Sequence, residues 1–213
     1  MGLIKFRFSP AYVSRPDRLK RVYMVGPDRS PFVLQSEVKG DILTCRREAS
    51  ESGRVHVPWS VPGFGEPVLA TSTLSERAEP YELVLELARG RLCELRDQMA
   101  DWVQMGLKVS DELVRTMNEA QLTFSKAAVS RDRPTDLNRW AQDSLVSALT
   151  AGHMLIELYV NQVLRTRVSG TSGRLSTQLA CRLDPDIRGK WASIYPEAFN
   201  AARVQCSWKA ISP

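Results

Sequence analysis

Cysteine and histidine are scarce in this chain of 213 residues, which contains four cysteines and two histidines. No two cysteines form a CxxC pair, so the sequence predicts neither a disulfide framework nor a zinc site. His153 and Glu157 stand one helical turn apart, but a metal site needs several converging ligands, and the other histidine, His56, lies in a different region. We therefore expect no metal, and buried free thiols in a reducing compartment. The cysteines are Cys45, Cys93, Cys181 and Cys206.

The sequence also lacks long runs of apolar residues. The stretch from Met1 to Arg18 has no apolar core of the kind found in secretory signals. The most apolar helical stretch, Ala148 to Leu164, is interrupted by His153 and Glu157, which argues against a membrane span. We therefore expect no membrane partner, and the lack of a visible signal favours the cytoplasm.

Common catalytic and nucleotide-binding motifs are missing as well. The chain has no P-loop and no GxSxG nucleophile elbow. Its GFG stretch, residues 63–65, lies between prolines with no helix after it, as is typical of a turn. The carboxylate pairs Glu82/Glu86 and Asp97/Asp101 are typical of exposed helix faces. We expect no catalytic residue and no cofactor in this chain.

Charge is unevenly distributed, because the whole formal excess of +5 comes from the first 60 residues, with eleven Lys and Arg against six Asp and Glu. The densest patch, SRPDRLKR, could hold phosphate or another polyanion through Arg15, Arg18, Lys20 and Arg21. A solvated loop explains it better, because nucleic-acid footprints usually extend over a whole domain. Nucleic acid is therefore not the expected partner.

Residues 1–76 read as short strands. LIKFRF, RVYMV and PFVLQSEV are rich in β-forming residues, and Pro and Gly separate these runs. This pattern predicts an antiparallel, sandwich-like β-domain.

Residues 77–167 read as three amphipathic helices. Thr73 with Glu76 resembles a capping box, and Pro80 suits a first helical turn. We therefore expect the first helix to begin between Thr73 and Pro80 and to end at Gly106. The second should start near Ser110, and the third should run from Pro134 to about Arg167. Their apolar stripes could share one seam. The stripes are Leu85, Ala88, Leu92, Leu95, Met99 and Trp102; Leu113, Met117, Ala120, Phe124 and Ala127; and Leu137, Ala141, Leu145, Ala148, Gly152, Leu155 and Tyr159.

A Gly/Ser-rich linker, residues 168–174, precedes the last segment. Residues 175–213 then give an apolar run, a turn at DPD, a helical turn near Trp191 and a second apolar run from Phe199. This is β-α-β order, typical of a parallel sheet. The predicted fold class of the whole chain is α+β.

One loop suggests ligand binding. In HVPWSVPGFGEP, Trp59 and Phe64 lie on a proline-stiffened segment and could offer flat faces to sugar rings. The alternative is that they cap the sheet against the first helix.

The segments LACRLDPDI and FNAARVQCSWKAISP resemble the first two β-strands of the family-10 glycoside hydrolases, the endo-β-1,4-xylanase barrels. The Asp184-Pro185-Asp186 turn is similar to the first turn of that family. Its second-strand pattern is matched at Phe199, Asn200, Trp208, Ile211 and Pro213. The resemblance is confined to residues 175–213, and the family's sugar-contacting Glu-Asn and Lys are replaced in the neighbourhood of Gln205, Cys206 and Ser207.

The resemblance implies a non-catalytic N-terminal accessory region, followed by the start of a (β/α)₈ barrel whose two catalytic glutamates lie on later strands. It implies polysaccharide and the rest of the barrel as partners. The candidate carbohydrate-binding residues are then Asn200 and Trp208, from the matching segment, together with Trp59 and Phe64 of the aromatic loop. Residues 175–213 should be poorly ordered or pack differently without that barrel. The alternatives are a protein-interaction module presenting the helices, and polyanion binding by the basic N-terminal part.

Overall fold

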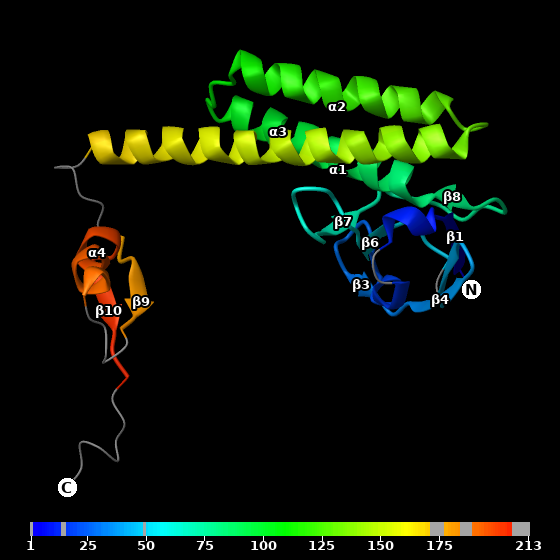
Figure 1. The fold of residues 1–213 in the computed structure, drawn as a ribbon, viewed down its shortest axis with the longest axis horizontal. Helices are drawn as coiled ribbons and strands as arrows, with labels where there is room; N and C mark the ends of the chain where they lie inside the picture. Colours follow the sequence, from blue (N-terminus) through cyan, green and yellow to red (C-terminus); the bar gives the residue numbers. More distant parts are fainter. Residues whose placement is uncertain (1, 14–15, 49, 171–176, 184–188, 206–213) are drawn as a thin grey trace, which may run out of the picture. The chain divides into compact units, whose positions relative to one another are not determined.

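The computed structural model describes residues 2–13, 16–48, 50–170, 177–183 and 189–205 (Figure 1). The chain divides into two compact units, Met1–Gln162 and Val163–Pro213. The first contains two β-sheets and helices, and the second a strand, a helix and a strand. This mixture confirms the predicted α+β class.

The strands of the first unit form two four-stranded sheets, ordered β4-β5-β1-β8 and β3-β2-β6-β7. Neighbouring strands run antiparallel, as predicted, except that β8 pairs in parallel with β1, with Phe6 opposite Tyr81. Short 3₁₀ turns at Pro10–Tyr12 and Pro16–Lys20 connect β1 to β2. The strands are β1 (Gly2–Arg7), β2 (Tyr23–Val25), β3 (Pro31–Phe32), β4 (Gln35–Lys39), β5 (Ile42–Arg47), β6 (Arg54–Pro58), β7 (Val68–Ala70) and β8 (Tyr81–Glu82).

Both sheets contribute to one hydrophobic core, because alternate side chains on each strand point inward. Phe6 and Leu43 of the first sheet are completely buried, as are Val55 and Val57 of the second. The same core includes residues from the helices, among them Leu87 and Leu145. The boundary predicted near residue 76 is therefore a change of secondary structure within one packed unit.

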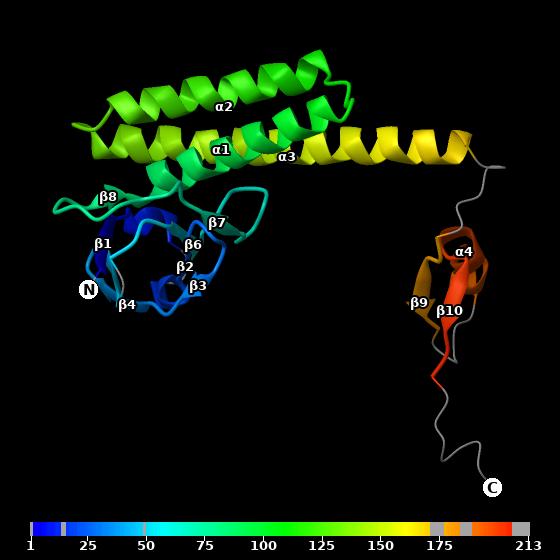
Figure 2. The ribbon, with the colours of Figure 1, turned by 180° about the vertical axis from the view of Figure 1, so that it is seen from behind.

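Three long helices follow, α1 (Leu83–Gln104), α2 (Asp111–Val129) and α3 (Pro134–Ser169). Figures 1 and 2 show them gathered on one side of the strands, with α1 next to the sheets. The predicted stripes are largely correct, since Leu113, Ala120 and Ala127 of α2 are completely buried. α2 begins next to Ser110, as predicted, and Ser110 caps it, because its Oγ accepts a hydrogen bond from the Leu113 N–H at 3.3 Å. Gly106 follows α1 with φ of +95°, the left-handed conformation expected after a helix end.

The predicted start of the first helix is wrong. Leu74 instead forms an isolated β-bridge with Gly53, with hydrogen bonds of 3.1 and 2.9 Å in the two directions. The Glu76 carboxylate lies 3.3 Å from Arg47, whose guanidinium is buried and needs a negative partner. The segment around Thr73 and Glu76 therefore forms no helix, because β-pairing of Leu74 and the long-range ion pair of Glu76 are made instead.

The second unit contains β9 (Ala180–Arg182), α4 (Lys190–Ala198) and β10 (Ala201–Arg203). β9 and β10 pair in parallel, which confirms the predicted β-α-β order. Of the predicted linker, Val168 and Ser169 are the last residues of α3, and residues 171–174 lie outside the described residues. The Asp184-Pro185-Asp186 turn lies outside them too.

Candidate functional site

Trp59 lies in the core and does not present its ring to solvent, since only 1% of the residue is exposed. Its indole Nε1 donates a hydrogen bond to Oε1 of Gln142 on α3 at 2.9 Å. Gln142 Nε2 in turn donates to the Ser60 carbonyl oxygen at 2.7 Å. Trp59 thus fastens the β6–β7 loop to a helix. This helix is α3, whereas the alternative given from the sequence was that Trp59 caps the sheet against the first helix.

Phe64 is half-buried at the tip of the same loop. Its ring meets the His153 ring of α3 edge-on, with centroids 5.2 Å apart and planes at 65°. The Val61 N–H donates to the Gly65 carbonyl oxygen at 2.9 Å, closing the turn below Phe64. One side of the ring is therefore occupied by His153, the histidine that the sequence placed at metal-ligand spacing from Glu157.

Asn200 uses both the oxygen and the nitrogen of its side-chain amide within the second unit. Its Oδ1 accepts from the Leu179 N–H at 2.7 Å, and its Nδ2 donates to the Thr177 carbonyl oxygen at 2.8 Å. Asn200 thus ties the chain before β9 to the chain before β10. Trp208, the fourth predicted carbohydrate-binding residue, lies outside the described residues.

The basic patch is partly neutralised. Arg18 forms an ion pair with Glu66, and Lys20 and Arg21 are exposed. Arg15 lies outside the described residues. This patch offers fewer unpaired cations to a polyanion than the sequence alone indicates.

A polar groove of about 450 Å³ lies where α1, α3 and the second sheet meet. The second sheet contributes Arg29, from the β2–β3 turn, and Arg54, from β6. One face of α1 contributes charged and amide side chains, and α3 adds an apolar wall. The other lining residues are Arg91, Glu94, Leu95, Asp97, Gln98, Asp101 and Trp102 of α1, and Gly152, Leu155 and Ile156 of α3.

The basic part of the groove is organised around Glu94. Its Oε1 lies 3.3 Å from Arg54, and its Oε2 lies 3.7 Å from Arg91, so one carboxylate joins a strand to its own helix. The Arg91 guanidinium lies against Gly152, where a Cβ atom would overlap it. The absence of a side chain at residue 152 therefore lets Arg91 lie across α3.

The acidic part of the groove contains Asp97 and Asp101, both exposed, next to Trp102. The Trp102 ring stacks on Tyr159 of α3, with centroids 4.0 Å apart and planes at 17°. This pair fixes the indole at the border of a small core cluster containing Leu95 and Leu155. The groove therefore combines opposite charges with a fixed aromatic side chain.

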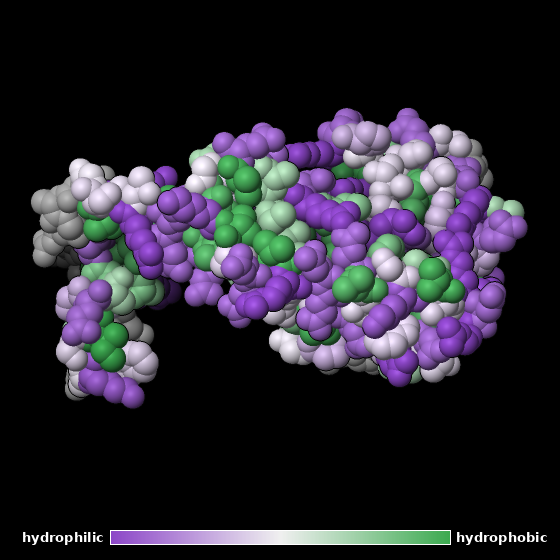
Figure 3. Space-filling model, turned by 90° about the horizontal axis from the view of Figure 1, so that it is seen from above, coloured by the Kyte–Doolittle hydropathy of each residue, from purple (hydrophilic) through white to green (hydrophobic). Residues whose placement is uncertain are grey.

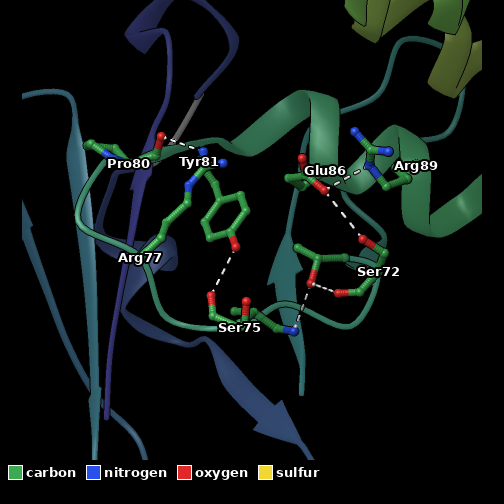
Figure 4. Close-up of polar contacts among 9 residues, drawn as sticks. Ser72, Ser75, Arg77, Pro80, Tyr81, Glu86 and Arg89 are labelled. Carbon is green, nitrogen blue, oxygen red and sulfur yellow. Dashed lines mark hydrogen bonds and ion pairs between the residues drawn. The ribbon is translucent and has the colours of Figure 1, made fainter. Parts of the chain in front are cut away.

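A polar network holds α1, and with it this face, against the sheets (Figure 4). The buried Glu86 carboxylate accepts hydrogen bonds from Ser72 Oγ at 3.3 Å and from Arg89 Nε at 3.0 Å. A Cβ at Gly90 would overlap the backbone of Ala70 and Thr71, so the helix and the chain after β7 approach as closely as a glycine permits. The start of α1 is thereby fixed on the second sheet.

The loop before α1 is fixed by a second group of contacts, also drawn in Figure 4. Tyr81 donates its hydroxyl to the Ser75 carbonyl oxygen at 2.9 Å. The Arg77 guanidinium lies 3.5 Å from the centre of the Tyr81 ring and donates to the carbonyl oxygens of Glu79 and Pro80. Arg77 thus closes the turn that leads into β8 and α1.

His56 lies beside Arg54 on β6 and stacks on Tyr23, with ring centroids 4.5 Å apart. Burial, and to a lesser extent the positive charge of Arg54, lower the pKa of His56 below its usual value of 6.5. The lowered pKa favours the neutral imidazole near pH 7.

In the part of the chain that the structure describes, no group of three or more His, Cys, Asp and Glu side chains is placed to hold a metal ion. Among its helices, none has the length and apolar character needed to span a bilayer.

Comparison of the chain with models of protein families, with curated proteins and with solved structures gives no match. The groove itself is the candidate functional site.

Sequence reasoning missed this groove although it noted several of its residues. From the sequence alone, Asp97 and Asp101 are typical of solvated helix surface, and Trp102 belongs to an apolar stripe. The available signal was helical spacing. Glu94 is three positions after Arg91, and Asp101 is seven positions after Glu94, so the three lie along one helix face. Only the fold shows that strand residues approach the same face.

Proposed function

We propose that the chain is a non-catalytic accessory region of a glycosidase resembling the endo-β-1,4-xylanases, together with the first β-α-β unit of the parent's barrel. In this proposal residues 1–162 bind carbohydrate, and the parent hydrolyses O-glycosidic bonds with two carboxylates that lie on later strands.

The observation that carries the proposal is the parallel pairing of β9 and β10 across α4. Parallel sheets occur almost only where both faces are covered, yet every residue of β9 is exposed. On α4, Trp191 is 59% exposed and Ile194 is 42% exposed. Such a unit needs further strands and helices to bury its apolar side chains, as successive β-α units supply in a barrel.

The sequence supports the same assignment. The strands β9 and β10 coincide with the segments that resemble the first two strands of family-10 glycoside hydrolases. Asn200, one of the matching positions, bridges the chain ahead of both strands. A conformational role inside the β-α-β unit is therefore proposed for this residue, in addition to any contact with sugar.

Protein binding through the helices has less support. On α2, Leu122 is 64% exposed and Val129 is 81% exposed. Figure 3 shows the hydrophobic residues of this face as separate patches among hydrophilic ones. Scattered exposed apolar residues are common on soluble proteins and do not mark an interface.

The test is the intact mass of the protein made by its native cells, followed by an assay of the purified product on β-1,4-xylan. We expect a mass well above 23.9 kDa, peptides that map beyond residue 213, and release of reducing sugar. A native product of 23.9 kDa would contradict the proposal, because it would contain no barrel.

A further inference from the structure

We infer that the groove between α1, α3 and the second sheet binds a neutral, hydroxyl-rich ligand, a segment of a sugar chain. The choice of sugars as probes rests on the proposed function, but the chemical argument rests on the groove alone. The site differs from the aromatic loop at Trp59 and Phe64 that the sequence suggested.

The charges of the groove balance. Arg29, Arg54 and Arg91 face three carboxylates along the lining, so the formal charge is zero. Glu94 already lies within ion-pair distance of two of the arginines. A polyanion entering the groove would meet the carboxylates, and a polycation would meet the arginines, so neither gains a net attraction.

The hydrogen-bonding groups suit hydroxyls. A hydroxyl group donates and accepts, whereas a guanidinium only donates and an ionised carboxylate only accepts. Arg29 projects from one wall, and Asp97, Gln98 and Asp101 from another, which supplies donors and acceptors within one hollow. Neighbouring hydroxyls of one sugar ring can engage both kinds of group at once.

The apolar lining suits the carbon skeleton of such a ligand. Ile156 is 50% exposed beside the buried Leu155, and Trp102 is fixed by stacking on Tyr159. An aromatic side chain that is already immobilised loses little conformational entropy on binding. The volume of about 450 Å³ lies within the range of small-molecule sites.

The test measures binding of the purified chain to an array of neutral glycans and to soluble β-1,4-linked xylo-oligosaccharides, with heparin as the anionic probe. The first variant is Asp97→Asn combined with Asp101→Asn, which keeps the shape and removes the charge. The second is Gly152→Ala, which displaces the Arg91 guanidinium without touching any other lining side chain. The matched control is Asp143→Asn, an exposed carboxylate on α3 that does not line the groove.

We expect neutral glycans to bind, each groove variant to weaken binding about tenfold or more, and the control to leave it unchanged. Circular dichroism must show the same fold in all four proteins. Binding that is equal in the groove variants and the control would overturn the inference. So would a failure to bind any neutral glycan, or tighter binding of heparin.

Failure of this test would leave the native-mass test of the accessory-region proposal unaffected. A native mass of 23.9 kDa together with groove-dependent sugar binding would contradict the barrel proposal and support the groove as a binding site.

Discussion

The indole Nε1 of Trp59 donates a 2.9 Å hydrogen bond to Gln142 Oε1, joining a loop and a helix that are 83 residues apart in sequence. Trp59 is among the largest completely buried side chains of the first unit. The bond satisfies a polar atom that burial would otherwise leave without water.

Trp59→Phe should therefore destabilise the chain by about 2–4 kcal/mol, because it creates a cavity and leaves Gln142 Oε1 without its donor. Urea unfolding followed by circular dichroism measures this. Trp140→Phe is the control, since that ring is only partly buried. A stable Trp59→Phe protein that has lost glycan binding would contradict this assignment and restore Trp59 as a ligand contact.

Two glycine-to-alanine substitutions in helices should have opposite effects. At Gly90 a Cβ would strike the backbone of Ala70 and Thr71, which cannot move without separating α1 from the sheet, so a loss of about 2 kcal/mol or more is expected. At Gly152 it would meet only the end of the Arg91 side chain, so the gain in helix propensity, up to about 1 kcal/mol, should prevail. Midpoints of thermal unfolding compare the two variants. Equal shifts of the same sign would contradict the described packing.

His56 should make stability depend on pH. Its pKa is lower in the folded chain, so the unfolded chain takes up the proton first on acidification. The free energy of unfolding should therefore fall as the pH drops through about 6.5. The stability that His56 contributes above this pH should be fully lost below its folded-state pKa. His56→Gln should show a smaller fall between pH 8 and pH 5 in urea titrations. An identical fall in both proteins would contradict this account.

Cysteine reactivity should separate buried from exposed thiols. Burial raises the pKa of Cys45 to about 12. Cys181 is exposed, so the prediction of buried thiols is wrong for this residue. Because the thiolate is the reactive form, Cys45 should be alkylated only after denaturation, and Cys181 in the native chain. Peptide mapping after iodoacetamide treatment distinguishes the sites, with Cys181→Ser as the control. Rapid native labelling of Cys45 would contradict its placement between β1 and β4.

Hydrogen exchange should be uneven along the chain. The amides of β1 and β5 lie in the middle of a sheet that packs on the hydrophobic core, whereas β9 and β10 are almost wholly exposed. We expect β9 and β10 to exchange orders of magnitude faster in the isolated chain. Equal protection would show that the second unit needs no further partner, and would weaken the barrel proposal.

The helices were predictable because local signals and packing agree. Ser110 caps α2, and buried Leu113, Ala120 and Ala127 recur at helical spacing. The start of α1 was not predictable, because a long-range partner, Arg47, decides the conformation around Glu76. The sequence indicates either ligand binding or packing for Trp59. It does not indicate its partner Gln142, because no periodicity reveals the burial of this polar residue.

The groove could not be predicted either, because it also depends on contacts between residues far apart in the sequence. Arg54 contacts Glu94, which is 40 positions later in the sequence, and the Arg91 guanidinium has space only because residue 152 is a glycine. Spacing along α1 identifies one wall of the groove. The opposite wall follows from how the sheet and α3 pack.

The position of β1 also limits how early its sheet can be completed during synthesis. β1 is made first among the described strands, yet it sits between β5 and β8, and its pairing with β8 waits until Tyr81 and Glu82 have been made. Such distant pairing slows folding. Until then Phe6 and Arg7 of the growing chain lack their backbone partners on this edge of β1, and an unpaired strand edge favours aggregation.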